Sequence, residues 1–369
     1  MRDLFLLDPD VVFLNHGSFG ACPKPVFEAY QAWQLRLERQ PVEFLGRQFN
    51  ALMAEARMAA GHYLHASADD IMFLPNATFG INLVARSLEL APGDEILTTD
   101  HEYGAVDYTW DYTGAKIVRQ AFPLPLTSDF VEEFWQGVTP HTKVIAISHI
   151  TSPTALMFPV EEICRRAREA GIITVIDGAH VPGQLPLDLT ALDADFYTGN
   201  FHKWLCAPKG CAFLYARREL QHLLKPLVVS WGWQDESFGN TPFIRHHQWQ
   251  GTRDVASFLS LPAAIQFQQE HDWDAIRQAC HELAVETRRR INGLTGEMPI
   301  CTDDQFMQMF TVAIPTDDVF ALKAQLYDTY KIELPAIQWQ GKPYMRVSIQ
   351  GYNTGADADA LLAGLSALL

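Results

Sequence analysis

Short apolar runs alternate with amphipathic stretches through the middle of the chain. Residues 143–148 and 172–176 are apolar and β-branched, which is typical of strands buried on both faces. Between them, four apolar residues at helical spacing follow Pro159, and Gly171 ends that stretch. Such a strand–helix–strand unit predicts a parallel sheet with helices on both faces. Further strands are expected at 194–198 and 211–215.

The two ends of the chain show other patterns. Residues 21–70 are rich in helix-forming stretches. After about residue 255 the expected elements are helices at 260–270, 274–293 and 319–330 and strands at 307–313 and 345–349. We therefore predict an α/β protein with an N-terminal segment (1–20), a large domain (21–254) and a smaller α+β C-terminal domain (255–369).

The composition narrows the class of protein. Of 369 residues, 48% are hydrophobic and 20% are charged, as in an ordinary folded protein. The net charge of −16 argues against partners such as nucleic acid or an anionic membrane, and no apolar run approaches the ~18 residues of a membrane span. The first residues lack the features of a signal peptide, and the six cysteines are scattered as in reduced proteins. We expect a cytoplasmic enzyme.

Two residues at the ends of expected strands are candidates for chemistry. Asp177 directly follows the run 172–176, and open parallel sheets bind ligands beyond the carboxyl ends of their strands. Lys203 stands among aromatic residues, where desolvation lowers the pKa of an amine and makes it a nucleophile. Asp177 could instead cap a turn, and Lys203 could be a surface charge. Together they suggest pyridoxal phosphate, with the lysine as Schiff base and the aspartate at the pyridine nitrogen.

A phosphate site is expected at residues 75–80, just before an apolar helix at 81–90. Small residues and a hydroxyl at a helix N-terminus offer backbone N–H groups and a favourable dipole to a dianion. Asn76 or Thr78 could instead serve only as the helix N-cap, and both interpretations can hold together.

Three motifs carry a resemblance to a known family: Asn76-Ala77-Thr78, Asp177-Gly178-Ala179-His180 and His202-Lys203. In this order and spacing they resemble class V aminotransferases, a branch of fold type I pyridoxal-phosphate enzymes that includes cysteine desulfurases. Residues 13–20 resemble, more narrowly, the isopenicillin N epimerase-like subgroup, and the likeness runs to residues 346–353. It implies pyridoxal 5'-phosphate as cofactor, a large cofactor-binding domain and an N-terminal segment that packs at the active site.

The resemblance also implies how the cofactor is held. Lys203 matches the Schiff-base lysine, and Asp177 matches the partner of the pyridine nitrogen. His180 matches the contact of the phenolic oxygen, and Tyr103 matches the ring placed over the cofactor. The expected phosphate contacts are Ala77, Thr78, Asn200 and His202.

Other matches concern the substrate and the partner subunit. Arg346 matches the clamp for the substrate carboxylate, a role suited to a bidentate guanidinium. Asn15 and His16 are expected at the lip of the active site, as substrate-binding residues. Thr252 matches a threonine supplied by the neighbouring subunit, which implies a homodimer with shared active sites.

Several of these residues could instead have purely structural roles. Tyr103 could be a core aromatic, Arg346 could form a surface ion pair, and Thr252 could be a turn residue. His149 and Ser152 are further candidates beside the cofactor. Three tryptophans could line the pocket or belong to the core: Trp231, Trp233 and Trp339.

The chain departs from cysteine desulfurases at residues 333–343. Desulfurases carry a mobile cysteine there, and this chain has none, so a persulfide-forming desulfurase is disfavoured. Cys206 and Cys211 lack a second pair of ligands, so no metal is expected. No G-x-G-x-x-G follows a strand, so a nicotinamide cofactor is not indicated.

The expected substrate is a small molecule, an amino acid or an amino-acid conjugate, which reacts at Cα or Cβ with Lys203 as the base. Reprotonation from the opposite face would make the protein an epimerase, with Tyr103 or His16 as the second acid. Loss of sulfur at Cβ would make it a C–S lyase, and the residues leave both open. An aminotransferase is an alternative, and a non-catalytic pyridoxal-phosphate binder is another, although the lysine and the aspartate are both present.

Overall fold

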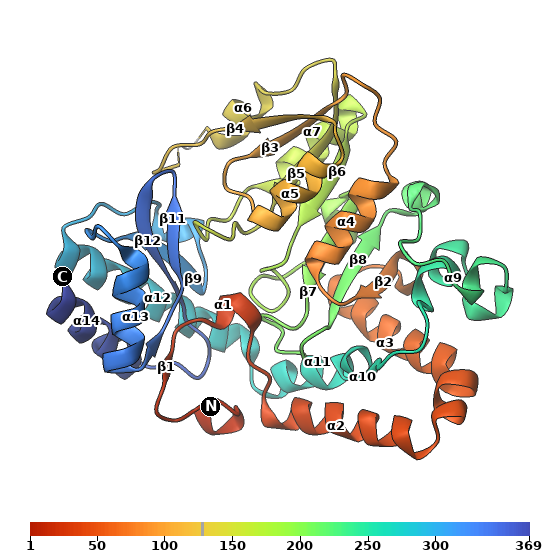
Figure 1. Cartoon of the computed structure of the whole chain (residues 1–369), viewed down its shortest axis with the longest axis horizontal. Coiled ribbons are helices and arrows are strands. Elements are labelled where there is room, and N and C mark those ends of the chain that lie inside the picture. Colours follow the sequence, from red (N-terminus) through yellow and green to blue (C-terminus); the bar gives the residue numbers. More distant parts are fainter. Residues whose placement is uncertain (127–128) are drawn as a thin grey trace.

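The computed structural model describes residues 1–126 and 129–369, and a seven-stranded sheet forms its centre (Figure 1). The strand order is β2-β8-β7-β6-β5-β3-β4. β8 is antiparallel to both of its neighbours, whereas the other neighbouring pairs are parallel. The strands are β2 (Ile71–Leu74), β3 (Glu95–Thr99), β4 (Lys116–Gln120), β5 (Thr142–Ser148), β6 (Ile173–Asp177), β7 (Phe196–Asn200) and β8 (Ala212–Ala216).

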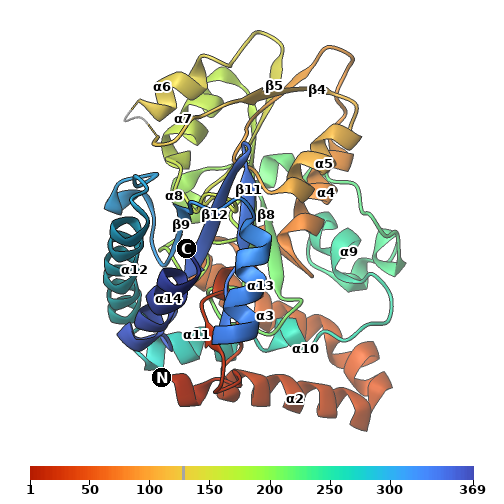
Figure 2. The same ribbon diagram turned by 60° about the vertical axis from the view of Figure 1, so that its left-hand side comes forward.

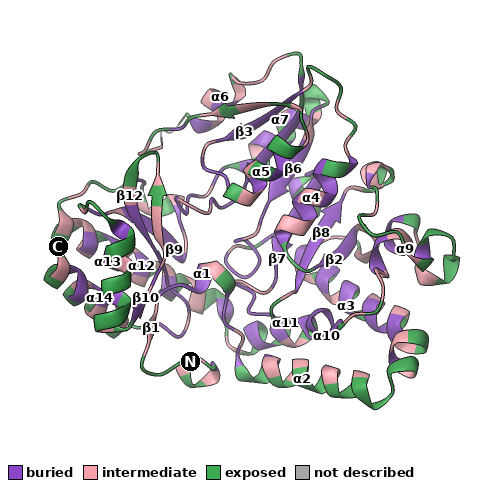
Figure 3. Cartoon of the chain, in the orientation of Figure 1, coloured by how far each residue is buried: buried purple, intermediate pink, exposed green. Residues whose placement is uncertain are grey.

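The alternation of side chains along a strand divides the core into two layers. In β5, Val144 and Ala146 pack on one face, and Ile145 and Ile147 pack on the other. The first face is covered by α4 (Ala77–Ser87), α5 (Gly104–Tyr112) and α9 (Pro242–Gln248). The second is covered by α3 (Phe49–Leu64), α6 (Phe130–Trp135), α7 (Val160–Ala170) and α8 (Leu189–Leu192). The central strands are therefore buried on both sides (Figure 3).

Helices from distant parts of the sequence form the base of the molecule. α2 (Lys24–Arg39) runs along the lower edge in Figure 1, and the π-helix η2 (Val42–Gln48) joins it to α3. Two later helices, α10 (Ala256–Leu259) and α11 (Leu261–Glu270), pack against α2 and α3. The short helices are α1 (His16–Phe19), η1 (Arg2–Leu4), η3 (Ala68–Asp70), η4 (Arg218–Leu223), η5 (Trp231–Trp233), η6 (Glu236–Phe238) and η7 (Asp303–Gln305).

The C-terminal part is a smaller α+β layer beside the central sheet (Figure 2). Its antiparallel sheet has the order β11-β12-β9, from β9 (Met309–Ala313), β11 (Ala336–Trp339) and β12 (Lys342–Ser348). Its helices are α12 (Trp273–Thr295), α13 (Val319–Tyr330) and α14 (Gly355–Leu368). A two-stranded parallel ribbon joins β1 (Val12–Phe13) to β10 (Ile332–Glu333), so the N-terminal segment is fastened to this layer.

The predicted fold class, a mainly parallel α/β sheet with a smaller α+β part, is confirmed. The helix expected after Pro159 is α7, and Gly171 ends it with a left-handed φ of 68°. The helix expected at 81–90 begins earlier, at Ala77, because Asn76 caps it. The division at residues 20 and 254 stays a prediction. No helix in the described ranges is long and apolar enough to cross a membrane.

Candidate active site

A cavity of about 360 Å³ lies where the large sheet, the smaller sheet and α1 meet. The strand ends of β5, β6 and β7 supply one wall, the first turn of α4 a second, and α1 with β12 a third. Nine predicted residues line it: Ala77, Thr78, Tyr103, Asp177, His180, Asn200, His202, Lys203 and Arg346. Ser152, a further candidate, lines it too. Residues more than 260 positions apart in the sequence thus face one space.

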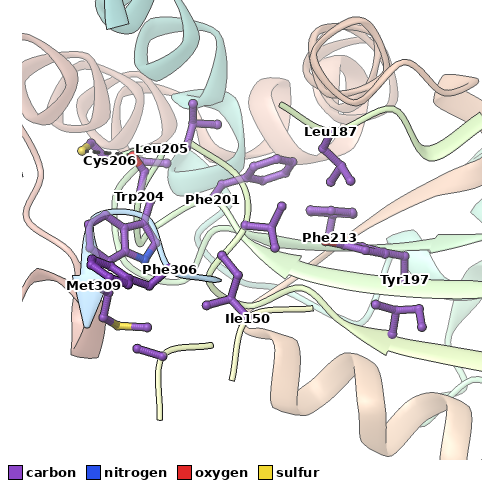
Figure 4. Close-up of a cluster of buried hydrophobic side chains, with 14 of the residues drawn as sticks. Ile150, Leu187, Tyr197, Phe201, Trp204, Leu205, Cys206, Phe213, Phe306 and Met309 are labelled. Carbon is purple, nitrogen blue, oxygen red and sulfur yellow. Dashed lines mark hydrogen bonds between the residues drawn. The ribbon is translucent and has the colours of Figure 1, made fainter. Parts of the chain in front are cut away.

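Lys203 stands on a tight turn that the core holds rigidly. Phe201 and Trp204, on either side of the lysine, are fully buried, as are Leu205 and Cys206 (Figure 4). The N–H of Cys206 donates to the carbonyl of Lys203 at 3.0 Å, and Cys206 itself has a φ of 62°. A non-glycine residue in that region is strained, so the surrounding packing must impose it.

Two glycines let neighbouring chain segments approach this turn. At Gly20, which has a φ of 70°, a Cβ would lie 2.0 Å from the carbonyl oxygen of His202. At Gly183, with a φ of 91°, a Cβ would lie 2.2 Å from the carbonyl of Trp204. Side chains at either position would push the lysine turn out of place.

The ring of His180 is oriented by Trp204. The indole N–H donates to His180 Nδ1 at 3.2 Å, and an indole nitrogen can only donate. The neutral imidazole therefore carries its proton on Nε2, which lies 3.2 Å from Lys203 Nζ. Burial and the charges of Lys203 and Arg346 keep the pKa of His180 well below its usual value, so the ring stays neutral.

The Lys203 amine is poised to lose its proton. Burial, aided by the nearby charge of Arg346, lowers its pKa from 10.5 to about 7, and Asp177 only partly opposes this. A neutral amine can accept the hydrogen bond that His180 Nε2 offers. The lysine expected to act as nucleophile therefore has the electrostatic setting that this role needs.

Asp177 ends β6 in a buried position, and Ser148 of β5 lies beside it in register. Its Oδ1 accepts the Ala179 N–H at 2.9 Å. Burial raises the pKa of this carboxyl, although the Ala179 N–H and the charge of Lys203 partly oppose the rise. No Lys, Arg or His in the described residues forms an ion pair with it. A protonated pyridine nitrogen would supply the missing cation, so the position fits pyridoxal phosphate.

The first turn of α4 fits the phosphate of the same cofactor. The N–H groups of Ala77 and Phe79 are taken by the side chains of Asn200 and Asn76, each at 2.9 Å. The Thr78 N–H and hydroxyl have no partner within the described chain, and both belong to a residue that lines the cavity. They remain available to an anion at the positive end of the helix.

His202 lines the same cavity. Its Nδ1 donates to the carbonyl of Cys211 at 2.9 Å, and burial lowers its pKa to about 4. A phosphate dianion beside the ring would raise that pKa.

Arg346 of β12 is 5% exposed and lines the cavity. One terminal nitrogen donates to the Ser152 carbonyl at 2.6 Å and the other to Ser18 Oγ at 3.2 Å. No Asp or Glu of the described residues pairs with it, and burial lowers its pKa to about 10. A buried guanidinium without an acid partner is costly unless an anion joins it.

Some predicted residues lie outside the cavity. Asn15 and His16 are buried behind it, and their neighbours Gly17, Ser18 and Phe19 form the lip instead. Hydrogen bonds hold the His16 ring in this buried position: its Nε2 contacts the Lys203 carbonyl and its Nδ1 contacts the Tyr352 hydroxyl, each at 3.0 Å. His16 is therefore not in a position to act as the second acid, and burial lowers its pKa to about 3.

Thr252 is exposed and is not part of this cavity wall, so its predicted role across a subunit interface remains a prediction. His149 points away from the cavity, to the hydroxyl of Tyr197 at 3.1 Å. The three tryptophans do not line the cavity either. Trp231 and Trp233 are exposed, and Trp339 donates to the carbonyl of Asp100 at 3.0 Å.

Sequence reasoning missed a buried acid beneath the cavity. Glu102 accepts hydrogen bonds from Thr99 Oγ1 at 2.7 Å and from Ser148 Oγ at 2.5 Å. Burial raises its pKa to about 8, so it is neutral at pH 7. Its position just before Tyr103 was the signal available in the sequence.

Within the described ranges, no group of three or more His, Cys, Asp or Glu residues could hold a metal ion. The cavity combines a desolvated lysine, a buried aspartate without an ion pair to any described residue, and a helix N-terminus. On a mainly parallel α/β sheet these features define the class of pyridoxal-phosphate enzymes of fold type I.

Comparison with known proteins agrees with this class. The family model described as aminotransferase class-V matches residues 14–361. An isopenicillin N epimerase of Amycolatopsis lactamdurans is 34% identical, over 100% of this chain and 97% of that protein. A probable chloroplastic L-cysteine desulfhydrase of Arabidopsis thaliana is 27% identical, over 98% of this chain and 84% of that protein. The solved structure of a C-DES mutant with glycine covalently linked to its PLP cofactor superimposes with a TM-score of 0.86, at 23% identity over 99% of both chains.

The chain belongs to the class V aminotransferase family. The predicted family is confirmed, and with it the prediction of a pyridoxal-phosphate enzyme.

Proposed function

We propose that this enzyme removes the Cα proton of an amino acid or amino-acid conjugate and returns a proton to the opposite face, as an isopenicillin N epimerase-like epimerase. The observation that carries the proposal is that one cavity holds two groups, one suited to the Cα proton of an amino acid and one to its carboxylate. Lys203 offers an amine with a pKa of about 7, and Arg346 offers a buried cation without an acid partner. The full-length similarity to an epimerase also supports it.

The residues of the cavity have separate roles in binding the substrate or the cofactor. Arg346 binds the α-carboxylate, held by Ser152 and Ser18. The Thr78 amide and the turn of α4 would hold the phosphate of the cofactor, and Asp177 would keep a proton on its ring nitrogen. The cofactor, when bound, supplies an electron-poor ring that accepts the electron pair left at Cα.

Lys203 takes the proton from Cα as its amine, which burial leaves about half neutral at pH 7 and largely neutral above that pH. His180, with its proton on Nε2 beside Lys203, is suited to donate a hydrogen bond to the cofactor's phenolic oxygen. The second proton must come from another group at the cavity. Tyr103 lines the cavity and is 50% exposed, so its hydroxyl is our candidate.

A C–S lyase is the second candidate, because relatives of this chain include a probable L-cysteine desulfhydrase. A lyase needs Lys203 but no acid on the opposite face. The Tyr103→Phe variant therefore separates the two: it should abolish inversion at Cα and leave elimination largely intact.

The experiment that tests the proposal uses the holoenzyme with isopenicillin N, a panel of L-amino acids and cysteine conjugates. Chiral chromatography measures inversion at Cα, and coupled assays measure pyruvate and sulfide. Inverted product without pyruvate or sulfide supports the epimerase. Stoichiometric pyruvate, together with sulfide from cysteine or with the corresponding thiol from a cysteine conjugate, overturns it in favour of the lyase.

Two further proposals concern the assembly and its compartment. A homodimer that shares its active sites is supported by Thr252, which lies exposed outside its own cavity, and by exposed Trp231 and Trp233. A cytoplasmic location is supported by six cysteines that are all unpaired. Sedimentation of the holoenzyme tests the first: a monomer that retains full activity would contradict it.

A further inference from the structure

A chain of hydrogen bonds leads from the clamp arginine to a carboxylate outside the cavity. Arg346 donates to Ser18 Oγ at 3.2 Å, and Ser18 donates to Asn15 Oδ1 at 2.5 Å. Asn15 Nδ2 in turn donates to Glu333 Oε1 at 3.0 Å. Every donor in the chain points the same way, from the guanidinium towards the carboxylate.

The direction of these bonds is fixed by chemistry. A serine hydroxyl has a single proton, and Ser18 uses it on Asn15, so only its lone pairs remain for Arg346. The amide of Asn15 accepts on oxygen and donates on nitrogen, which suits its place between a hydroxyl and a carboxylate. Aligned bonds of this kind polarise and strengthen one another.

The backbone holds this chain in place. Phe13 pairs with Glu333 in the β1–β10 ribbon, and the N–H of Ser348 donates to the carbonyl of Leu14 at 2.9 Å. The N–H of Gly17 donates to Ser348 Oγ at 3.2 Å, and a Cβ at Gly17 would lie 2.6 Å from Met309 Sδ. The N-terminal segment therefore lies in a fixed register between β10 and β12.

We infer that Ser18, Asn15 and Glu333 form a positioning relay that orients Arg346 for the substrate carboxylate. The relay partly compensates the positive charge of the buried Arg346 guanidinium, and it does so without an acid in direct contact with that group. A carboxylate in direct contact would compete with the substrate, whereas a serine oxygen leaves that side of Arg346 open. Asn15, expected to bind substrate, acts through Arg346 instead. The inference rests on the proposed role of Arg346 as the carboxylate clamp.

The test measures how well the holoenzyme distinguishes an amino acid from the same amine without its carboxylate. L-Norvaline and 1-butylamine are such a pair, and both react through the amine with the bound cofactor. Titrations followed by the visible absorbance of the cofactor give an apparent Kd for each. The ratio of the two values reports the carboxylate interaction alone, and a general loosening of the fold would not change it.

We expect Ser18→Ala to reduce this preference for norvaline about tenfold, the size of one lost hydrogen bond to a charged group. Butylamine should bind as it does to the wild type, and Ser18→Thr, which keeps the hydroxyl, should restore the ratio. Glu333→Gln keeps an acceptor but removes the charge, so we expect a loss of about threefold. Glu333→Gln also tests the relay if Ser18→Ala fails to fold. Glu286→Gln, in an exposed ion pair with Arg290, is the matched control and should change nothing.

The outcomes separate the relay from the clamp. If Arg346→Ala leaves the preference intact, the proposed clamp itself is wrong. If Arg346→Ala abolishes it but Ser18→Ala and Glu333→Gln leave it intact, the clamp stands and the relay is overturned. Equal losses of norvaline and butylamine in Ser18→Ala would also overturn the relay, since they would indicate a purely structural role.

Discussion

The low pKa of Lys203 predicts how fast the cofactor-free protein captures pyridoxal phosphate at neutral pH. Only the neutral amine attacks the aldehyde of the cofactor. At pH 7, a lysine with a pKa of about 7 is half neutral, whereas one at the usual 10.5 is neutral in roughly one molecule of 3,000. The capture rate should therefore exceed that of an ordinary lysine by about a thousandfold.

The assay is stopped-flow absorbance of the apoprotein mixed with pyridoxal phosphate between pH 5.5 and 10. Free lysine, measured in parallel, corrects for the titration of the cofactor itself. The rate should rise with pH and level off above about pH 7, because the amine loses its proton there. Arg346→Gln removes a cation that lowers the pKa of Lys203, so it should move this midpoint upwards. A wild-type midpoint near pH 10 would refute the reasoning.

Other predictions follow from the same cavity. Lys203→Ala should lose activity and the visible band of the bound cofactor while its circular dichroism stays that of the wild type; a variant that keeps both would overturn the lysine's role. Asp177→Asn should retain cofactor but lose at least about a hundredfold in kcat, since the neutral amide cannot hold a proton on the ring nitrogen; unchanged kcat would refute this. Thr78→Ala should weaken cofactor binding about tenfold by equilibrium dialysis, the size of one hydrogen bond to a charged group, and pyridoxal without phosphate should show no such loss.

The fold was predictable where local pattern decides it. α7 has its apolar stripe, its proline start and its glycine end in consecutive residues, so the sequence alone predicts it. The two-residue strands β1 and β10 carry no such pattern, because they exist only through a pairing across more than 300 positions. α14 was not predicted from the sequence either.

The candidate site shows the same division. Asp177 ends β6 and Lys203 lies three residues after β7, so the strand-end argument and the motifs place them together. The partners that tune them come from elsewhere: Ser18 reaches Arg346 across 328 positions, and Trp204 fixes the His180 tautomer across 24. His16 was predicted at the lip from the resemblance of residues 13–20, and only the packing reveals that its ring turns towards the Lys203 carbonyl.

Exchange of the Cα proton in deuterium oxide tests the central claim most directly. Wild-type holoenzyme and Lys203→Ala would be incubated with the amino acid that shifts the cofactor band most strongly, and proton NMR would follow the Cα signal. The account predicts that the wild type replaces this proton with deuterium and that Lys203→Ala does not. Equal exchange by both proteins, or none by a wild type that binds the amino acid, would contradict it.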